Sequence, residues 1–443
     1  MTMNLPDAIQ GCLNALETAG FAAFLVGGCV RDACLGLEPH DYDICTAALP
    51  EETEAVFSDH RLVLAGKKHG TVGVVTEGDV VEITTFRTEG DYRDNRHPEW
   101  VEFVPEIEKD LARRDFTVNA MAWSPTRGFA DPFGGRKDLE NRILRAVGHP
   151  ETRFQEDSLR ILRGVRFAVR FGMTVDAETE AAMRSQAHLM DNLARERVFE
   201  ELCKLIPLTS ARDLCRFAPV LCRVIPELAP LVGYDQKNHH HAYDLFTHTA
   251  LVVEHCPQNL ALRWAALLHD IGKPFCMTFG EDGQAHYHGH AAVSAEMADG
   301  ILRRLKAPTA LREQVVLLIG KHMTLPLPEK KYLRRHLGKL GRENMDALLM
   351  LQEADTLATG TVHDNELSLF SDVRSILEEI QAENACLSLK DLTLNGHDLM
   401  ALGYSGKAIG QTLNRLLNLV LEEQCENTRE ALLSILTTKE NTL

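Results

Sequence analysis

The sequence lacks the features that membrane-bound and secreted proteins carry. No stretch approaches the roughly 18 consecutive apolar residues of a membrane-spanning helix, since the best runs, FAAFLV and VVLLIG, are core-sized. The start, MTMNLPDAIQGCLNALETAG, has no basic segment followed by an apolar run, so it does not resemble a secretory signal. The 11 cysteines include no CxxC pair, which argues against a disulfide scaffold or a zinc ribbon. We expect a cytoplasmic protein with reduced cysteines and no membrane partner.

Basic residues are also scarce, since 47 Lys and Arg stand against 64 Asp and Glu and give a net charge of −17. That deficit argues against a general nucleic-acid binder, because phosphate binding depends on Lys and Arg. The charge is uneven, however. Residues 136–170 hold nine basic and five acidic side chains, and a second basic cluster lies at 329–342. We therefore expect weak non-specific affinity for nucleic acids together with a locally basic surface along the helices that follow residue 138.

The 443 residues are typical of a globular chain of several domains and divide into a mixed part and a helical part. In the first part, residues 5–19, 30–35 and 50–57 predict helices, and FAAFLVGG, TVGVVTEGDVVEITTF and EWVEFV predict strands. From Asp138 onward strand signals vanish and helical periodicity dominates, with a proline-marked boundary near 205–235. The predicted fold class is α+β, a mixed N-terminal α/β region followed by an all-α remainder.

Two carboxylates in the first part form a candidate metal site. Asp41 and Asp43 lie two residues apart, so on a strand both project from the same face. Carboxylates together with substrate phosphates are the ligands that Mg²⁺ prefers. Upstream, Gly28 lies in a Gly-Gly pair between a strand and a helix, where bare N–H groups approach a phosphate, and Arg31 follows to pair with it. A lone DxD is also typical of surface turns, but the combination indicates a nucleotide-phosphate and magnesium site.

A strand and a helix supply further candidates. Glu82 lies in VVEITTF with apolar neighbours on the other face, so it either completes the metal site or faces solvent. The segment DLARRDFTVNAMAW places Arg113, Arg114, Asp115 and Asn119 at helical spacing. This pattern fits a salt-bridged helix surface, although a half-buried amide at position 119 needs hydrogen-bond partners.

A third motif suggests how a base would be selected. We expect RFQEDSLRILRGVRFAVR to form one helix with Asp157, Arg160, Arg163 and Arg166 recurring every three residues. A basic helix surface is the plain interpretation. However, an Asp acceptor beside an Arg donor complements cytosine and adenine, which present an amino donor beside a ring-nitrogen acceptor. Uracil and guanine would instead place a carbonyl against the aspartate. Such a pair can select C and A without a nucleic-acid template.

These motifs occur in the order of a known family. LVGGCVRDACLG with HDYDI, FRTEGDYRDNRHPEWVEFV, LARRDFTVNAMA, DPFGGRKDL and RFQEDSLRILRGVRFAVRFG resemble the motifs of class II tRNA nucleotidyltransferases, the CCA-adding enzymes, over roughly residues 21–200. The resemblance implies template-independent addition of CCA to the tRNA 3′ end from CTP and ATP by a two-metal mechanism. It also implies that FRTEGDYRDNRHPEW is the family's flexible loop, which accompanies full CCA addition.

The resemblance implies roles residue by residue. Asp41 and Asp43 would be catalytic metal ligands, whereas Glu82 is a third catalytic candidate from its strand position alone. Asp157 and Arg160 would read the base. The full set with implied nucleotide contacts is Gly28, Arg31, Arg114, Asp115, Asp157, Arg160, Arg163 and Arg166.

The helical part is rich in histidine, with many of the 19 histidines between residues 239 and 322. Imidazole and carboxylate ligands suit a transition-metal ion such as Ni, Mn, Fe or Zn. A single His on an apolar face is more often a core residue, but an adjacent His-Asp pair among six candidates favours a site for two ions. The candidate ligands are His248, His269, Asp270, His290, His322 and Asp355.

The order H…HD…H…H…D, with IGKP after the HD pair, resembles HD-superfamily phosphohydrolases over about residues 240–360. The resemblance implies that His290 and His322 serve a second ion and the other four candidates the first. The triple His239–His241 lies outside the pattern, so we interpret it as a loop or a polar helix start. A metal-bound structural module without activity is the alternative for this region.

The resemblances together predict four domains. These are a nucleotidyltransferase head (1–137), a helical nucleotide- and RNA-binding neck (138–235), an HD phosphohydrolase domain (236–365) and a helical tail (366–443). CCA addition with an HD phosphohydrolase activity is the leading function, with no obligate protein partner evident. The alternatives are a bacterial poly(A) polymerase, which shares nearly every head motif, and an HD hydrolase whose head only binds RNA. The nearly neutral end LLSILTTKENTL, in place of an arginine-rich tail, favours CCA addition.

Overall fold

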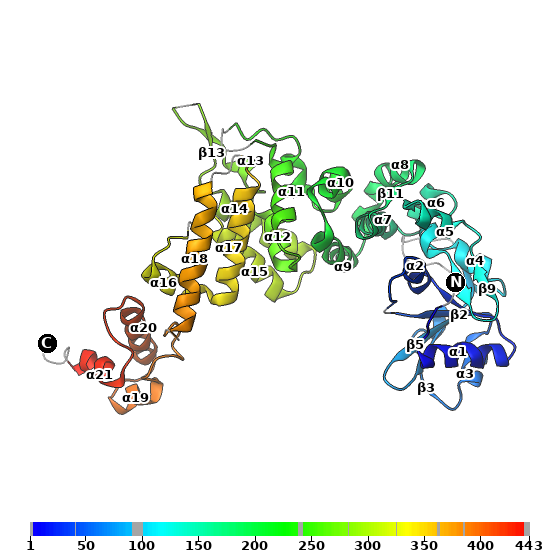
Figure 1. The fold of residues 1–443 in the computed structure, drawn as a ribbon, viewed down its shortest axis with the longest axis horizontal. Helices are drawn as coiled ribbons and strands as arrows, with labels where there is room; N and C mark the ends of the chain where they lie inside the picture. The colour runs from blue at the N-terminus through cyan, green and yellow to red at the C-terminus, as the bar shows by residue number, and fades with distance from the viewer. Residues whose placement is uncertain are drawn as a thin grey trace. The chain divides into compact units, whose positions relative to one another are not determined.

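A computed structural model of the chain describes residues 3–39, 41–90, 101–237, 242–281, 283–324, 326–360, 364–383 and 386–437. The chain forms two compact units, Met1–Leu208 with Arg216–Pro226 and Thr209–Cys215 with Glu227–Leu443. Figure 1 shows the strands of the first unit and the predominantly helical second unit. The predicted α+β class is confirmed, whereas the four-domain division stays a prediction.

The first unit is built on a seven-stranded mixed sheet of order β3-β4-β5-β2-β1-β8-β9. β2 and β5 pair in parallel, and the other neighbours are antiparallel. The strands are β1 (Ala23–Val26), β2 (Asp43–Thr46), β3 (Arg61–Val63), β4 (Thr71–Val75), β5 (Val80–Thr85), β8 (Ala122–Ser124) and β9 (Gly128–Ala130). β1 is buried along its whole length, as its apolar run predicts. β5 alternates, with Val81 and Ile83 buried and Glu82 exposed, so its predicted pattern is confirmed.

Helices of six to thirteen residues complete the first unit. They are α1 (Asp7–Thr18), α2 (Gly28–Cys34), α3 (Pro50–Val56), α4 (Ile107–Ala112), α5 (Gly135–Glu140), α6 (Pro150–Glu156), α7 (Leu159–Phe171), α8 (Ala177–Ser185) and α9 (Arg195–Leu205). The helices predicted at 5–19, 30–35 and 50–57 correspond to α1, α2 and α3. α10 (Ala211–Val224) has residues in both units. α7 and α9 pack against each other and carry most of the arginines discussed below.

Three local predictions are wrong. The segment expected as one helix is broken into α6 and α7, because Asp157 has extended backbone angles (φ −141°, ψ 103°). α4 ends at Ala112, so the residues from Arg113 onward leave the helix, and Thr117–Asn119 form a separate 3₁₀ turn. β2 begins only at Asp43, so Asp41 precedes the strand.

Strands also continue beyond Asp138, contrary to expectation. They form two-residue pairs, β10 (Ile143–Leu144) with β11 (Thr174–Val175) and β12 (Thr278–Phe279) with β13 (Ala285–His286). Two residues are too few to show an alternating pattern in the sequence. β6 (Arg87–Glu89) pairs with β7 (Val101–Phe103), which confirms the strand expected in EWVEFV. The flexible-loop segment between them lies largely outside the described residues, as does the triple His239–His241.

The second unit consists mainly of helices. They are α11 (Leu245–His255), α12 (Leu260–Leu268), α13 (Lys273–Cys276), α14 (His290–Arg304), α15 (Thr309–Lys321), α16 (Lys330–Leu340), α17 (Arg342–Leu357), α18 (Asp364–Ala382), α19 (Gly396–Ala401), α20 (Lys407–Leu421) and α21 (Arg429–Thr437). Asp244 caps α11 by accepting hydrogen bonds from the first turn, and Asn259 caps α12 in the same way. These caps fix the starts of α11, which carries His248, and of α12, which His269 and Asp270 directly follow.

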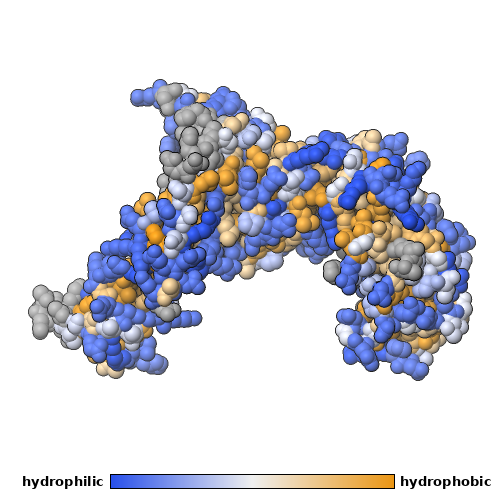
Figure 2. Space-filling model, viewed as in Figure 1, coloured by the Kyte–Doolittle hydropathy of each residue, from blue (hydrophilic) through white to orange (hydrophobic). Residues whose placement is uncertain are grey.

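The surface and the cysteines agree with the composition. In the view of Figure 2, hydrophilic residues cover most of the visible surface and hydrophobic residues show in smaller patches between them. Within the described ranges, no helix is long and apolar enough to span a membrane. All 11 cysteines are free thiols, as expected from the missing CxxC pairs.

Candidate functional site

The first unit contains an arginine-rich pocket of about 450 Å³. Nine of the eleven residues predicted for the head and neck line it, the exceptions being Asp41 and Glu82. Eight arginines and three aspartates contribute to the lining. The first unit of this strongly acidic chain therefore contains a locally positive cavity that suits a polyanion such as a nucleoside triphosphate. The nine predicted lining residues are Gly28, Arg31, Asp43, Arg114, Asp115, Asp157, Arg160, Arg163 and Arg166.

The Gly-Gly turn brings the backbone against an arginine. Gly27 has φ 72° and ψ −123°, a conformation that only glycine adopts easily, and it is the residue before α2. A Cβ atom at this position would lie 2.9 Å from Nη1 of Arg114. Nη2 of Arg114 donates to Asp110 at 3.1 Å, which holds the side chain in place. The turn therefore needs glycine for the close approach of Arg114 as well as for its backbone angles.

A chain of hydrogen bonds joins α2 to α7 across the pocket. Arg31 donates from Nη1 to the Asn119 amide oxygen at 2.6 Å, and the Asn119 amide nitrogen donates to Asp115 at 3.0 Å. Arg163 donates to the other oxygen of Asp115 at 2.9 and 2.6 Å. Burial alone would raise the pKa of Asp115, but Arg163 and the Asn119 hydrogen bond bring it down to about 2. The Asn119 amide, which the sequence indicated would need hydrogen-bond partners, therefore has one for its oxygen and one for its nitrogen.

Arg31 is itself buried, which lowers its pKa, while the carboxylate of Asp32 beside it acts in the opposite direction. Asp32 accepts from Nε and Nη2 of Arg31 at 2.8 and 2.7 Å. The guanidinium also lies over the rings of Phe171 (4.5 Å) and Phe167 (5.3 Å). Arg31 is therefore held from three sides before any ligand arrives.

Of the three carboxylates of the predicted metal site, only Asp43 lines the pocket. Asp43 begins β2 and lines the pocket, and Asp41 lies two residues earlier and is exposed. Desolvation raises the pKa of Asp43, Arg114 lowers it, and the nearby Asp41 carboxylate raises it further. The parallel register that pairs Ile44 with Ile83 places Glu82 on the strand beside Asp43. Carboxylates are the donors that a hard divalent cation prefers, so this part of the site suits Mg²⁺.

The two residues predicted to read the base lie near the break between α6 and α7. Arg197 of α9 donates to Asp157 with Nη2 at 2.8 Å. Arg160 donates to Glu156 at 2.5 Å and to the carbonyl oxygen of Arg113 at 3.0 Å. Because Asp157 precedes α7, the two side chains approach the pocket from a turn and a helix rather than from one helix face.

The remaining predicted arginine, Arg166, differs from its neighbours because it is engaged in a buried ion pair. Its Nε atom donates to Glu201 of α9 at 2.6 Å, and the two side chains are 8% and 6% exposed. Its guanidinium also lies 4.3 Å from the centre of the Phe167 ring. Arg166 lines the pocket and at the same time ties α7 to α9.

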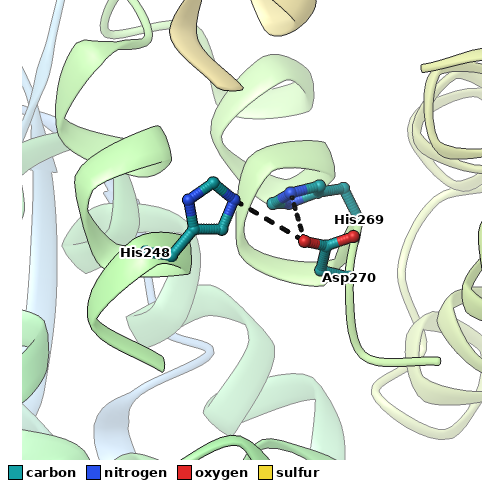
Figure 3. A group of neighbouring side chains, drawn as sticks. All are labelled: His248, His269 and Asp270. Carbon is teal, nitrogen blue, oxygen red and sulfur yellow. Dashed lines mark ion pairs between the residues drawn. The ribbon is translucent and has the colours of Figure 1, made fainter. Parts of the chain in front are cut away.

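The second unit gathers all six predicted ligands. Figure 3 shows His248 on α11 pointing toward His269 and Asp270, which directly follow α12. Two groups of three form potential metal sites and share Asp270. One group adds His248 and His269, and the other adds the two ligands expected for a second ion. All members of both groups are buried, and the second group comprises Asp270, His290 and His322.

The histidines are oriented as metal ligands are. Nδ1 of each faces a backbone carbonyl oxygen at 2.7–3.2 Å, in the order Ala358, Ala266, Tyr287 and Ile319 for His248, His269, His290 and His322. A carbonyl oxygen can only accept, so each Nδ1 donates and each Nε2 is directed into the cluster. Asp355 approaches from α17, with Oδ1 3.0 Å from Nε2 of His248. This donor set fits a transition-metal ion.

The ionisation of the clustered histidines and aspartates also favours a bound cation. Asp270 and Asp355 raise the pKa of His269 to about 10, although its burial acts in the opposite direction. The pKa of each carboxyl lies well below its usual range, chiefly because neighbouring imidazoles outweigh the effect of burial. Burial and the neighbouring His269 lower the pKa of His322 to about 4. The buried carboxylate of Asp270 and the partly exposed one of Asp355 thus attract positive charge to this cluster.

Several residues of both sites escaped the sequence interpretation. Arg197 and Phe167 line the pocket of the first unit, but neither belongs to a motif that singled it out. In the second unit, Lys273 pairs with Asp270 at 2.7 Å and donates to Gln236 at 3.2 Å. Its position three residues after the HD pair was the available signal. Gln352 donates to the carbonyl oxygen of His322 at 2.9 Å, a contact that no pattern indicates.

Comparison with family models gives three matches. The model "Poly A polymerase head domain" matches residues 23–145, and "Probable RNA and SrmB- binding site of polymerase A" matches 172–214. The model "tRNA nucleotidyltransferase domain 2 putative" matches residues 289–436. The matched regions thus include the sheet of the first unit and helices of both units.

Curated relatives and a solved structure extend these matches over the whole chain. The CCA-adding enzyme of Streptococcus thermophilus is 32% identical over 437 residues, 97% of each protein. That of Ligilactobacillus salivarius is 48% identical over 206 residues, which cover 46% of this chain and half (50%) of the relative's length. The crystal structure of the Bacillus stearothermophilus CCA-adding enzyme in complex with CTP has a TM-score of 0.72 and 27% identity, covering 99% of this chain and 100% of the other.

Proposed function

The chain belongs to the CCA-adding tRNA nucleotidyltransferases, and on this premise we propose that it adds C, C and A to the 3′ end of tRNA from CTP and ATP. The observation that carries the proposal is that Asp43, Asp157 and Arg160 line one arginine-rich pocket. The pocket combines groups for a triphosphate with groups for a base. The CTP bound to the similar B. stearothermophilus enzyme supports CTP as a substrate.

The triphosphate would lie against the arginines between α2 and α7. Arg31 and Arg163 are held by the Asn119–Asp115 network, so their guanidinium groups are ordered before binding. Ordered donors lose less entropy on binding than free side chains. Gly28 lines the same pocket, and its lack of a side chain would let phosphate oxygens approach the backbone.

Asp41 and Asp43 would hold Mg²⁺, with Glu82 of the neighbouring strand as a further carboxylate. When bound there, Mg²⁺ would lower the pKa of the RNA 3′-hydroxyl and neutralise charge on the leaving pyrophosphate. The protein side chains orient the nucleotide so that the 3′-hydroxyl attacks the α-phosphorus in line with the pyrophosphate.

Base choice would rest on Asp157 and Arg160. The carboxylate accepts a hydrogen bond from the amino group of cytosine or adenine, and the guanidinium donates to the ring nitrogen beside it. Uracil and guanine instead place a carbonyl oxygen against the carboxylate, so two acceptors face each other. The lost hydrogen bond to a charged group corresponds to about 1.5–3 kcal/mol, or roughly 10- to 150-fold discrimination.

For the second unit we propose a metal-dependent phosphohydrolase of the HD superfamily. Its support is the buried pair of ligand groups that share Asp270, together with the inward-directed Nε2 atoms. The residues would bind Ni, Mn, Fe or Zn, which would supply a nucleophilic hydroxide and polarise a phosphoryl oxygen. Phosphomonoester or 2′,3′-cyclic phosphate ends of damaged RNA are the substrate class that fits an RNA 3′-end enzyme. A structural metal module is the competing interpretation.

The test uses a tRNA that lacks its 3′ CCA, with Mg²⁺ and single nucleotides. We expect two residues with CTP alone and three with CTP and ATP together. Long A tails would instead identify a poly(A) polymerase, and no addition would leave only an RNA-binding head. Replacing Asp41 and Asp43 by Asn should abolish nucleotide addition and leave phosphatase activity. His269→Ala should abolish phosphatase activity and leave nucleotide addition. A cytoplasmic location and the lack of an obligate protein partner stay predictions.

A further inference from the structure

Arg197 of α9 holds the carboxylate that would read the base. Nη2 of Arg197 donates to Oδ2 of Asp157 at 2.8 Å, and Nη1 approaches Oδ1 at 3.4 Å. The backbone N–H of Leu159 also donates to Oδ1, at 3.1 Å. Both carboxylate oxygens are therefore engaged from the α9 side and from the chain itself, and the plane of the carboxylate is fixed.

The two base-reading groups have separate partners. Asp157 is paired with Arg197, whereas Arg160 is paired with Glu156 and with the Arg113 carbonyl oxygen. Within the described part of the chain, no ion pair joins Asp157 to Arg160. Since both line the same pocket, this separation keeps an acceptor and a donor available side by side.

Helix α9 is itself anchored so that it can act as a rigid support. Glu201 follows Arg197 by one helical turn and forms the buried ion pair with Arg166 of α7. Val198 and Leu202 on the same helix are fully buried. The side chains of Arg197 and Asp157 are 24% and 17% exposed, so their ion pair is partly shielded from water. The Arg197 guanidinium therefore projects from a fixed position rather than from a loose surface helix.

We propose that Arg197 is a positioning residue that determines base selectivity by orienting the Asp157 carboxylate. The inference rests on the proposed function, because it assumes that Asp157 reads the base. Without Arg197, the carboxylate can rotate about its side-chain bonds and pair with Arg160, which removes acceptor and donor from the base at once. The loss falls on discrimination between bases and on nucleotide binding, not on the chemistry at Asp41 and Asp43.

The experiment measures kcat and KM for CTP and UTP with the full-length protein, Mg²⁺ and a tRNA lacking its 3′ CCA. For Arg197→Ala we expect the CTP/UTP ratio of kcat/KM to fall about ten-fold, with a raised KM for CTP, because one charged hydrogen-bonding partner is lost. Arg197→Lys keeps the charge without the two-pronged geometry and should lie between the two. Millimolar guanidinium chloride should partly restore the ratio in the alanine variant.

Arg195→Ala is the matched control, because Arg195 lies in the same first turn of α9 but donates to the carbonyl oxygen of Asp191 at 2.9 Å. It should keep the wild-type ratio. An unchanged ratio in Arg197→Ala, or a lower KM for CTP, would overturn the inference, and Arg197→Lys decides the question if the alanine variant does not fold. If the wild-type protein adds no C at all, the proposed function fails instead, so the two failures are distinguishable.

Discussion

Gly27 offers a direct test of how the nucleotide pocket is built. Its φ of 72° with ψ of −123° disfavours any side chain, and a Cβ atom would lie 2.9 Å from Nη1 of Arg114. In Gly27→Ala the backbone strain costs about 1–3 kcal/mol of stability. The Arg114 side chain must also move, which weakens its hydrogen bond to Asp110.

The displacement of Arg114 should appear in catalysis. A hydrogen bond to a charged group contributes about 1.5–3 kcal/mol, so we expect kcat/KM for CTP to fall roughly 10- to 100-fold. The strain alone should not have this effect. Gly20→Ala provides the control, because Gly20 also has a positive φ (92°) but no atom within 4 Å of a Cβ.

The assay compares thermal unfolding and kcat/KM for CTP in both variants. Both should lose stability, and only Gly27→Ala should lose activity well beyond the control. If the two variants have kcat/KM values within two-fold of each other, the close approach of Arg114 to the turn has no role in nucleotide binding and the reasoning is refuted.

Three further predictions concern charge and metal. Asp115→Asn should lower the free energy of unfolding by about 2 kcal/mol at pH 7, because the pKa of Asp115 is about 2 in the folded protein and 3.8 in the unfolded chain. This stabilisation is fully present above pH about 5 and is lost as the pH falls through 2. Urea unfolding at pH 3 should therefore show about half the difference between wild type and variant, and equal differences at both pH values would contradict the assignment. Glu201→Leu should destabilise the first unit by about 3–5 kcal/mol, because it leaves the buried Arg166 guanidinium without its partner. In thermal unfolding, the double variant with Arg166→Met should recover most of the lost stability. A double variant as unstable as Glu201→Leu would exclude the unpaired arginine as the cause. In the Asp41→Asn, Asp43→Asn variant, metal analysis should find two bound ions per chain. Adding Asp270→Ala should leave fewer than one ion per chain, and adding His322→Ala should leave about one. Two ions in the Asp270 variant would rule out Asp270 as a shared ligand.

The local parts of both sites could be predicted because their signals lie within a few residues. The Gly-Gly turn, the DxD pair and the HD pair each have a short pattern. The six histidine and aspartate candidates are spread over residues 248–355 and were grouped by the resemblance to a family, and they lie in one cluster. The alternation in β5 likewise predicted that Val81 and Ile83 lie on the opposite face of the strand from Glu82. In these short patterns, the residues that carry the chemistry lie in the same few positions as the residues that determine the local structure.

The parts that could not be predicted depend on long-range contacts. Arg197 is 40 residues from Asp157, and Arg31 is 88 residues from Asn119, so no periodicity links them. The break at Asp157 was missed because the flanking sequence has helical spacing on both sides, while the extended angles at one residue leave no mark on that spacing. Tertiary contacts of Asp157 with α9 accompany this break. Propensity alone therefore favoured one helix where the pocket requires two.

The central claim is that protein side chains in the pocket of the first unit select C and then A. The most direct measurement is to incubate the protein and a tRNA lacking its 3′ CCA with all four nucleoside triphosphates at equal concentration and to sequence the new 3′ ends. We predict that the products end in CCA and extend no further. Products with frequent U or G, or with long runs of A, would contradict the account.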